Sequence, residues 1–290
     1  MSRFFHKLKR MLFKPLYRRF DEINQSINEM NRRIDEMKQY SETQDIALNE
    51  KINSIWKIKE YQNVVLEKNR HTVVYTCLTG SYDEIIQQSY INFDCDYVCF
   101  TDNSDLLRFN PYGLWKMMPL QYSKLDNTKN SRWHKIHPHI LFPNYENSIW
   151  IDANVNIKTK SLFSTIENNK TNMLIPIHFE RDCIYNEADA VSFSNYDLEI
   201  NINKMLDFLR KENFPSHYGL NETNIIYRKH NTKEIISMMD MWWTFIENYS
   251  KRDQLSLSYV LWKHNVDPSD ISFTNARFDE ANFKVYVHKH

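Results

Sequence analysis

Between residues 69 and 265 the chain alternates short apolar runs with longer helical patterns, and this alternation most limits the possible fold. Runs rich in β-branched and aromatic residues predict strands at 71–78, 96–100, 149–151, 172–179 and 225–228. Helical patterns occupy residues 130–141, 197–213, 232–249 and 252–263. Strands and helices in alternation bury their apolar faces as a sheet covered by helices. The sequence therefore predicts an α/β domain over residues 69–290.

Polar side chains follow several of these predicted strands. Asp83 and Asp102 come after the first two strands, Asp152 ends the run from Ile149, and His178 ends a later strand. Ligands of open α/β sheets bind beyond the carboxyl ends of the strands. We therefore expect these four side chains to line one polar crevice.

The strand exit at Asp152 has the composition of a cation site. Asp152 and Asn154 are two residues apart, and their side-chain oxygens suit a hard divalent cation that holds a diphosphate. Asp and Asn are also ordinary turn residues, and taken alone this short segment fits a simple turn.

Glycine is scarce, with only Gly80, Gly113 and Gly219 in 290 residues. Neither the dinucleotide fingerprint G-x-G-x-x-G nor the P-loop can be written with them. A bound nucleotide would therefore be held by side chains and a metal. The formal net charge is zero, so the composition does not indicate a nucleic-acid partner.

The four cysteines show no C-x-x-C spacing, and Cys77 and Cys99 fall inside predicted strands. Buried, reduced thiols in a reducing compartment are expected. No segment approaches the roughly 18 apolar residues of a transmembrane helix. No uninterrupted apolar region of a signal peptide follows the basic start. These features predict a cytoplasmic chain.

Residues 1–19 form a basic amphipathic segment that contains no acidic residue. Aromatic and aliphatic residues recur at helical spacing between its lysines and arginines, as in segments that bind anionic membranes. The segment predicts peripheral contact with the inner face of the cell membrane. A disordered basic tail is the alternative.

Residues 20–60 carry a heptad pattern typical of a coiled coil. The seam positions are Phe20, Ile27, Ile34, Leu48 and Ile55 on one side and Ile23, Met30, Met37 and Ile58 on the other. Polar residues interrupt the seam at 41, 44 and 51. The pattern predicts a homo-oligomer through a short stalk, or else a helix that packs on its own domain.

Seven segments between residues 73 and 256 recur in the order of a known family. They are VVYTCLTGSYDE (73–84), DYVCFTD (96–102), NSRWHKIHPH (130–139), LFPNYENSIWIDAN (141–154), HFERDCIYNEA (178–188), GLNETNIIYRKHN (219–231) and WWTFIENYSKRDQLS (242–256). Together they closely resemble the glycosyltransferase-like family that includes plant turgor-defect and mucilage-related proteins.

The resemblance implies a GT-A-like fold with a mixed sheet, a nucleotide-sugar donor, a cell-surface or capsular glycan acceptor, and Mn²⁺ or Mg²⁺. The metal motif of such enzymes is commonly Asp-x-Asp, and the matching positions here are Asp152 and Asn154. An amide in place of the second carboxylate lowers the charge offered to the metal. A late histidine often completes the site, which makes His288 the candidate third ligand and His290 its rival.

Further roles follow from the same resemblance. The donor would be bound by Thr76, Tyr82, Asp83, Asp102, Arg132 and Lys135. Catalysis would involve His178, Arg181, Asp182, Glu187, Asp253 and Gln254. Structural alternatives remain: a solvated basic helix face for Arg132 and Lys135, turn chemistry after the first strand, an ion pair of Glu187 with Arg181, and a helix cap for Asp253.

Two other functions stay open at this point. The chain could be a coiled-coil adaptor that carries an inactive sugar-binding domain, which the amide at Asn154 would support. A plant relative is linked to ceramide hydrolysis, so a metal-assisted amidase that uses Asp152 and His178 is the second alternative.

Overall fold

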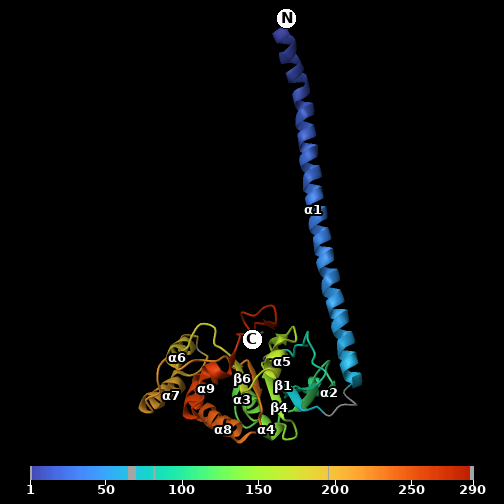
Figure 1. Ribbon diagram of the computed structural model, residues 1–290. Helices are drawn as coiled ribbons and strands as arrows, with labels where there is room; N and C mark the ends of the chain where they lie inside the picture. Colours follow the sequence, from blue (N-terminus) through green and yellow to red (C-terminus); the bar gives the residue numbers. More distant parts are fainter. Residues whose placement is uncertain (1, 65–69, 81–82, 195, 288–290) are drawn as a thin grey trace. The chain divides into compact units, whose positions relative to one another are not determined.

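The computed structural model describes residues 2–64, 70–80, 83–194 and 196–287. Within the N-terminal helix it describes the side chains of residues 25, 27–44, 46–48 and 51–62. The contacts divide the chain into two compact units, residues 1–56 and 57–290. Helix α1 (Ser2–Val64) makes up the first unit and continues into the start of the second (Figure 1).

The apolar seam of α1 is exposed in the single chain. Ile27, Ile34 and Met37 are 45%, 48% and 71% exposed. The charged flanks of the helix pair with each other instead, as where Arg32 donates to Glu29 over 2.9 Å. The coiled coil and the homo-oligomer stay predictions, because one chain leaves the seam open.

The backbone of the basic segment 1–19 is helical from Ser2 onward, but its side chains lie outside those described. Among the residues that the structure describes, no helix combines the length and the apolar character needed to cross a membrane.

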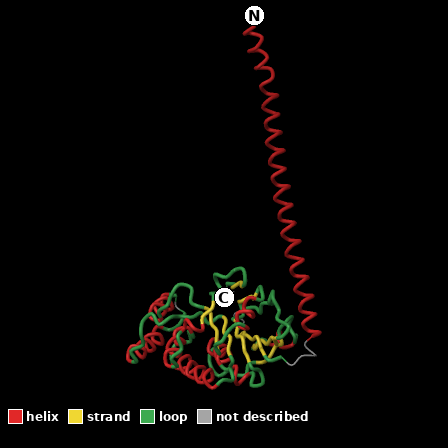
Figure 2. The backbone as a smooth tube through the Cα atoms, viewed as in Figure 1, coloured by secondary structure: helices red, strands yellow, loops and turns green. Residues whose placement is uncertain are grey.

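The second unit is built on a mixed sheet, drawn in yellow in Figure 2. Its strand order in the described chain is β3-β2-β1-β4-β7-β6-β8. The strands are β1 (Thr72–Leu78), β2 (Cys95–Thr101), β3 (Lys116–Pro119), β4 (Asn147–Ile151), β6 (Met173–Pro176), β7 (Ile225–Arg228) and β8 (Ser272–Phe273). All neighbours pair in parallel except β7, which runs antiparallel to β4 and β6. β5 (Val155–Ile157) and β9 (Phe283–Val285) form a small antiparallel sheet.

The two faces of the sheet bury two separate apolar clusters, because successive side chains of a strand point to opposite faces. Val73 and Tyr75 face a cluster shared with α3 (Asn127–Ile136), α6 (Ile184–Phe193), α7 (Glu199–Lys211), α8 (Lys233–Asn248) and α9 (Gln254–Lys263). Val74 faces the other cluster, with α5 (Ser161–Glu167), β9 and Tyr61. Figure 1 shows α6 to α9 grouped on one side of the strands and α2 (Ser104–Arg108) and α5 on the other.

The predicted α/β fold with a mixed sheet flanked by helices is confirmed. Two predicted elements are interrupted or end early at a proline. The helix predicted at 130–141 breaks at His137, because Pro138 lacks an N–H and disfavours helical geometry in the residue before it, and α4 (Pro138–Leu141) follows. The strand predicted at 172–179 ends at Pro176, which places His178 in the loop beyond it. The second unit begins at Lys57, before the predicted start at 69, because Tyr61 packs into its core.

All four cysteines are free and buried, as the sequence predicts. Burial raises the pKa of Cys95 to about 12, so this thiol is protonated at neutral pH.

Candidate functional site

A polar cavity of about 420 Å³ opens at the carboxyl edge of the sheet. It is lined by the loop after β1, the N-terminal half of α3, the exit of β4, the segment before β7, the start of α9, Tyr196 and Arg277. Its polar lining includes Asp83, Arg132, Asp152, Glu222, Asn224, Lys251, Arg252, Asp253, Gln254 and Arg277. Of the four side chains expected in one crevice, Asp83 and Asp152 line this cavity, whereas Asp102 and His178 do not.

Because β7 runs antiparallel to β4, the first residue of β7 lies at the edge of the sheet where β4 ends. Ile151 at the end of β4 pairs with Ile225 at the start of β7. The Asp152 N–H then donates to the Asn224 carbonyl over 2.8 Å. Residues 222–224 are consequently neighbours of Asp152, although seventy residues separate them in the chain.

A buried ion pair lies beneath the cavity. Lys135 is wholly buried, and its Nζ donates to Asp253 Oδ2 over 2.5 Å. The same oxygen accepts from Thr223 Oγ1 at 2.9 Å and lies 3.3 Å from Arg132 Nε. Burial alone would favour the neutral acid, but the charges of Arg132 and Lys135 hold the pKa of Asp253 well below its usual range. Asp253 is therefore an ionised counterion.

The Asp253 side chain does not cap helix α9, contrary to the structural alternative for this residue. Asp253 occupies the N-cap position of α9 but makes no side-chain capping hydrogen bond there. Lys135, in turn, lies behind the cavity wall instead of on a solvated basic face. Arg132, from the same turn of α3, lines the cavity and is 17% exposed.

Asp152 projects into the cavity and is 27% exposed. Its Oδ1 accepts from Trp150 Nε1 at 2.7 Å and lies 3.7 Å from Lys135 Nζ. One carboxylate that faces a cavity is a suitable ligand for a divalent cation, which often takes its other ligands from substrate phosphates and water. Within the described ranges, no group of three or more His, Cys, Asp or Glu side chains could hold a metal.

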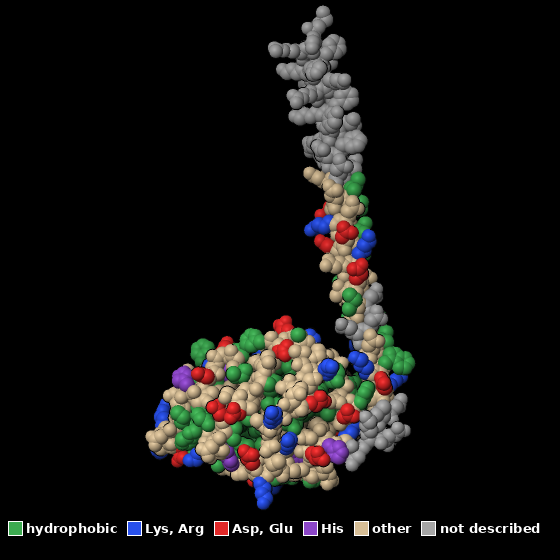
Figure 3. Space-filling view, in the orientation of Figure 1, with side chains coloured by type: hydrophobic (Ala, Val, Ile, Leu, Met, Phe, Trp, Pro, Cys, Tyr) green, Lys and Arg blue, Asp and Glu red, His purple; other side chains and the backbone are tan. Residues whose placement is uncertain are grey.

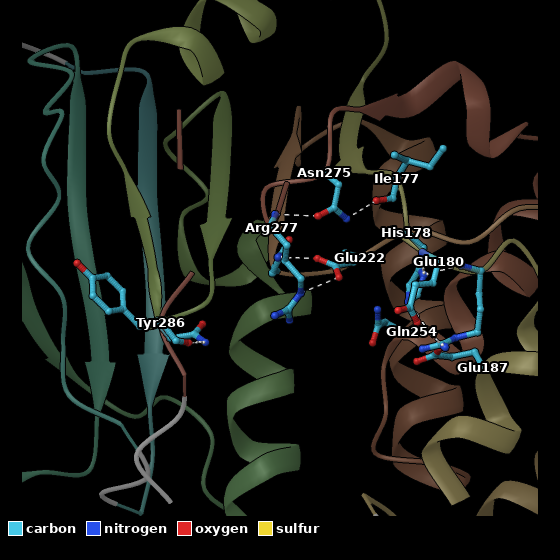
Figure 4. Close-up of polar contacts among 12 residues, drawn as sticks. Ile177, His178, Glu180, Glu187, Glu222, Gln254, Asn275, Arg277 and Tyr286 are labelled. Carbon is cyan, nitrogen blue, oxygen red and sulfur yellow. Dashed lines mark hydrogen bonds and ion pairs between the residues drawn. The ribbon is translucent and has the colours of Figure 1, made fainter. Parts of the chain in front are cut away.

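Asn154 is buried and is not part of the cavity lining. Its Nδ2 donates to the Tyr286 carbonyl over 2.7 Å, and the Tyr286 N–H donates back to the Asn154 carbonyl. Asn154 thus ties the segment after β9, which carries the Tyr286 labelled in Figure 4, to the exit of β4. This position does not favour it as a metal ligand. His288, the predicted third ligand, and Tyr82, predicted to bind the donor, lie outside the described residues.

The loop after β1 depends on Gly80. Its φ is +65°, and a Cβ there would lie 2.1 Å from Asn127 Nδ2. The Gly80 N–H donates to Asp102 at 3.0 Å, and Thr79 Oγ1 donates to the Asn127 carbonyl. Asp102 therefore holds this loop through the Gly80 N–H, from an exposed position outside the cavity lining. Thr76 is fully buried in β1 and does not reach the cavity either.

A second polar group lies outside the cavity lining. His178 Nε2 is 3.5 Å from Glu187 Oε2, and the same oxygen accepts from Arg181 Nε at 2.6 Å. Burial lowers the pKa of His178, and the negative charge of Glu187 opposes this shift. Asp182 pairs with His217 at an exposed position. In the view of Figure 4, Gln254 projects between this group and Glu222.

Glu222, Asn224 and Arg277 line the cavity but were not predicted as site residues, and the same holds for Lys251 and Arg252. Glu222 Oε1 accepts from Arg277 Nε at 2.8 Å, and its Oε2 accepts from Asn224 Nδ2 at 2.8 Å. Asn275 fixes Arg277 by accepting from its N–H at 2.8 Å, and donates to the Ile177 carbonyl (Figure 4). The motif GLNETN directly before a predicted strand was the available signal. Its importance depends on the antiparallel direction of β7.

Four cationic side chains line the cavity together with its acidic ones, and charges of both signs are also mixed over the face drawn in Figure 3. Arg132, Lys251, Arg252 and Arg277 all line it. The Arg252 guanidinium lies 5.0 Å from the centre of the Tyr196 ring, and its Nη2 donates to Gln254 Oε1. Guanidinium and ammonium groups are the usual partners of phosphate oxygens. The cavity is suited to an anionic ligand.

Comparison with known proteins agrees with this geometry. Residues 46–290 match the family described as TOD1/MUCI70, glycosyltransferase-like domain. The probable hexosyltransferase MUCI70 of Arabidopsis thaliana is 22% identical over 236 residues, which are 72% of this chain. The chain spans 40% of the length of that relative.

Two similar solved structures are the apo form of mouse xyloside xylosyltransferase 1 and the apo WbbM bifunctional glycosyltransferase. Each has a TM-score of 0.39 and matches 71% of this chain. The xylosyltransferase is 9% identical and is covered over 84% of its own chain, and WbbM is 11% identical and is covered over 39% of its own chain. The family match confirms the predicted resemblance: this chain belongs to the TOD1/MUCI70 family and carries its glycosyltransferase-like domain.

Proposed function

We propose that residues 57–290 transfer a sugar from a nucleotide-sugar donor to a glycan acceptor. The observation that carries this proposal is the cavity at the carboxyl edge of β1 and β4. Its lining combines the cations Arg132, Lys251 and Arg252 with the carboxylate of Asp152. Membership of a glycosyltransferase-like family supports the same reaction class. A cell-surface or capsular glycan is the acceptor that we propose.

The order of the elements along the cavity suggests how the donor lies. The loop after β1 and the first residues of α3 would hold the nucleoside, with Asp83 at its edge. Arg132, Lys251 and Arg252 would bind the diphosphate. The segment before β7 and Gln254 would then contact the sugar.

We propose that Mn²⁺ or Mg²⁺ binds at Asp152 together with the donor phosphates. A divalent ion there would neutralise charge on the leaving diphosphate. The exposure of Asp152 in the cavity supports this assignment. Asn154 is assigned instead to holding Tyr286.

The N-terminal segments complete the proposal. Residues 1–19 would hold the protein peripherally on the cytoplasmic face of the membrane by their basic charge. The exposed seam of α1 would pair with the same seam of another chain. Flotation with anionic liposomes tests the first point: deletion of residues 1–20 should abolish binding, and undiminished binding would refute it.

Calorimetric titration with a panel of nucleotide-sugars, with and without Mn²⁺, tests the main proposal. Wild type should bind one donor in a metal-dependent manner, and Asp152→Ala should weaken that binding about 10–100-fold. Asp207→Asn is the matched control, because Asp207 is an exposed residue of α7. Failure of every nucleotide and nucleotide-sugar to bind in the presence of metal would refute the transferase and favour the adaptor. No observation favours the amidase, since His178 lies 3.5 Å from Glu187 and outside the cavity lining.

A further inference from the structure

The acids of the cavity differ in what their oxygens contact. Asp253 accepts hydrogen bonds from Lys135 and Thr223 and pairs with Arg132, so its charge is compensated within the protein. Asp152 lies near the cations of α3, with its Oδ1 3.7 Å from Lys135 Nζ. Glu222 is separate from that ion-pair network and reaches the cavity from the segment before β7.

Glu222 is held in one orientation. Its side chain is 4% exposed, Oε1 accepts from Arg277 Nε, and Oε2 accepts from Asn224 Nδ2. The Glu222 N–H donates to the Pro176 carbonyl over 2.9 Å, which fixes the backbone as well. A carboxylate offers about four lone-pair sites, so acceptor capacity remains for a ligand.

The surroundings of Glu222 allow its carboxylate to stabilise a positive charge that develops beside it. Burial raises the pKa of Glu222 and the nearby Asp152 adds to that rise, while Arg277 opposes it. A buried carboxylate with fixed partners needs no reorganisation when charge appears beside it, which makes it effective in a transition state. Asp253 is less suited to this role, because two cations, Lys135 and Arg132, compensate its charge, whereas Glu222 pairs with one cation, Arg277.

We propose that Glu222 is a catalytic residue that faces the anomeric carbon of the donor sugar; this inference rests on the proposed transferase function. As the bond from the anomeric carbon to the diphosphate oxygen breaks, its electron pair leaves on the diphosphate. The positive charge left on the anomeric carbon and ring oxygen is stabilised by the Glu222 carboxylate. The acceptor hydroxyl oxygen bonds to the anomeric carbon, and its proton passes to the departing diphosphate.

Glu222→Gln tests the assignment, because it removes the charge and keeps the side-chain shape and an acceptor oxygen for Arg277. We expect kcat for sugar transfer to fall about 10²–10³-fold. The Kd for the nucleotide-sugar, measured by calorimetry, should stay within about threefold of wild type, a change below 1 kcal/mol. Glu234→Gln is the matched control, since Glu234 is an exposed residue of α8 outside the cavity lining.

The outcomes separate the two proposals. Donor binding by wild type without loss of kcat in E222Q would overturn the role of Glu222 and leave the transferase standing. Loss of donor affinity with unchanged kcat would also overturn it, because Glu222 would then bind the ground state. Absence of donor binding by wild type would instead refute the proposed function. If E222Q unfolds, Glu222→Ala replaces it: rescue of turnover by added formate supports the role, and no rescue overturns it.

Discussion

Replacement of Lys135 by methionine is the sharpest test of the charge arrangement beneath the cavity. Lys135 is wholly buried and Asp253 is 2% exposed, with 2.5 Å between Nζ and Oδ2. Removal of one partner of a buried ion pair typically costs about 3–5 kcal/mol, because the other charge stays buried. Arg132 and Thr223 still contact the same oxygen, so we expect the lower end, about 3 kcal/mol.

Urea unfolding followed by tryptophan fluorescence measures this loss at constant m value. Lys233→Met is the control, an exposed lysine of α8 expected to change the free energy of unfolding by less than about 0.5 kcal/mol. The double variant K135M/D253N should recover most of the loss, since no buried charge is then left unpaired. A loss below about 1 kcal/mol in K135M, or a double variant as unstable as the sum of the two singles, would refute the reasoning.

The pH dependence gives a second measure of the same pair. The folded-state pKa of Asp253 is depressed, so the stabilisation exists above its unfolded pKa and disappears as the pH falls. The difference between wild type and K135M should therefore shrink as the pH drops through and below the ordinary aspartate pKa of about 3.9. A difference that stays constant from pH 7 to pH 3 would contradict an ionised Asp253.

Three further predictions concern the loop, the core and the stalk. Gly80→Ala should lower the free energy of unfolding by about 1–3 kcal/mol in urea titration and weaken donor binding, because of its positive φ and the approach of Asn127; unchanged stability would contradict the strain. Tyr75→Phe should cost about 1–3 kcal/mol, since the buried Arg228 loses the hydroxyl that accepts its Nη2–H at 2.6 Å; a cost below about 0.5 kcal/mol would argue against it. Ile34→Asp should lower the oligomer mass in light scattering if the seam of α1 pairs between chains; an unchanged oligomer would place the interface elsewhere.

The element types of the second unit could be predicted because strand and helix periods are local properties. The strand at 225–228 and the helix at 254–263 appear where the pattern indicates them. Prediction failed at Pro138 and Pro176, where the end of an element depends on backbone groups that a period does not report.

The candidate site was predictable only in part. Asp83, Arg132, Asp152, Asp253 and Gln254 line the cavity, as expected from strand ends and the family resemblance. Thr76 and Lys135 are buried behind its wall, and Asp102 is an exposed residue outside its lining. The group of His178, Arg181 and Glu187 forms beside it. Strand exits show which side chains reach the edge of the sheet, but not which way they point once there.

The sequence by itself determined the α/β class, the family, the buried thiols and the position of Asp152 at a strand exit, because each depends on local pattern or on a run of matching residues. Only the tertiary structure decided that Lys135 is an internal counterion and that Glu222 reaches the cavity. Lys135 meets a partner 118 residues away, and Glu222 depends on the antiparallel course of β7. Both are long-range pairings, which no local period encodes.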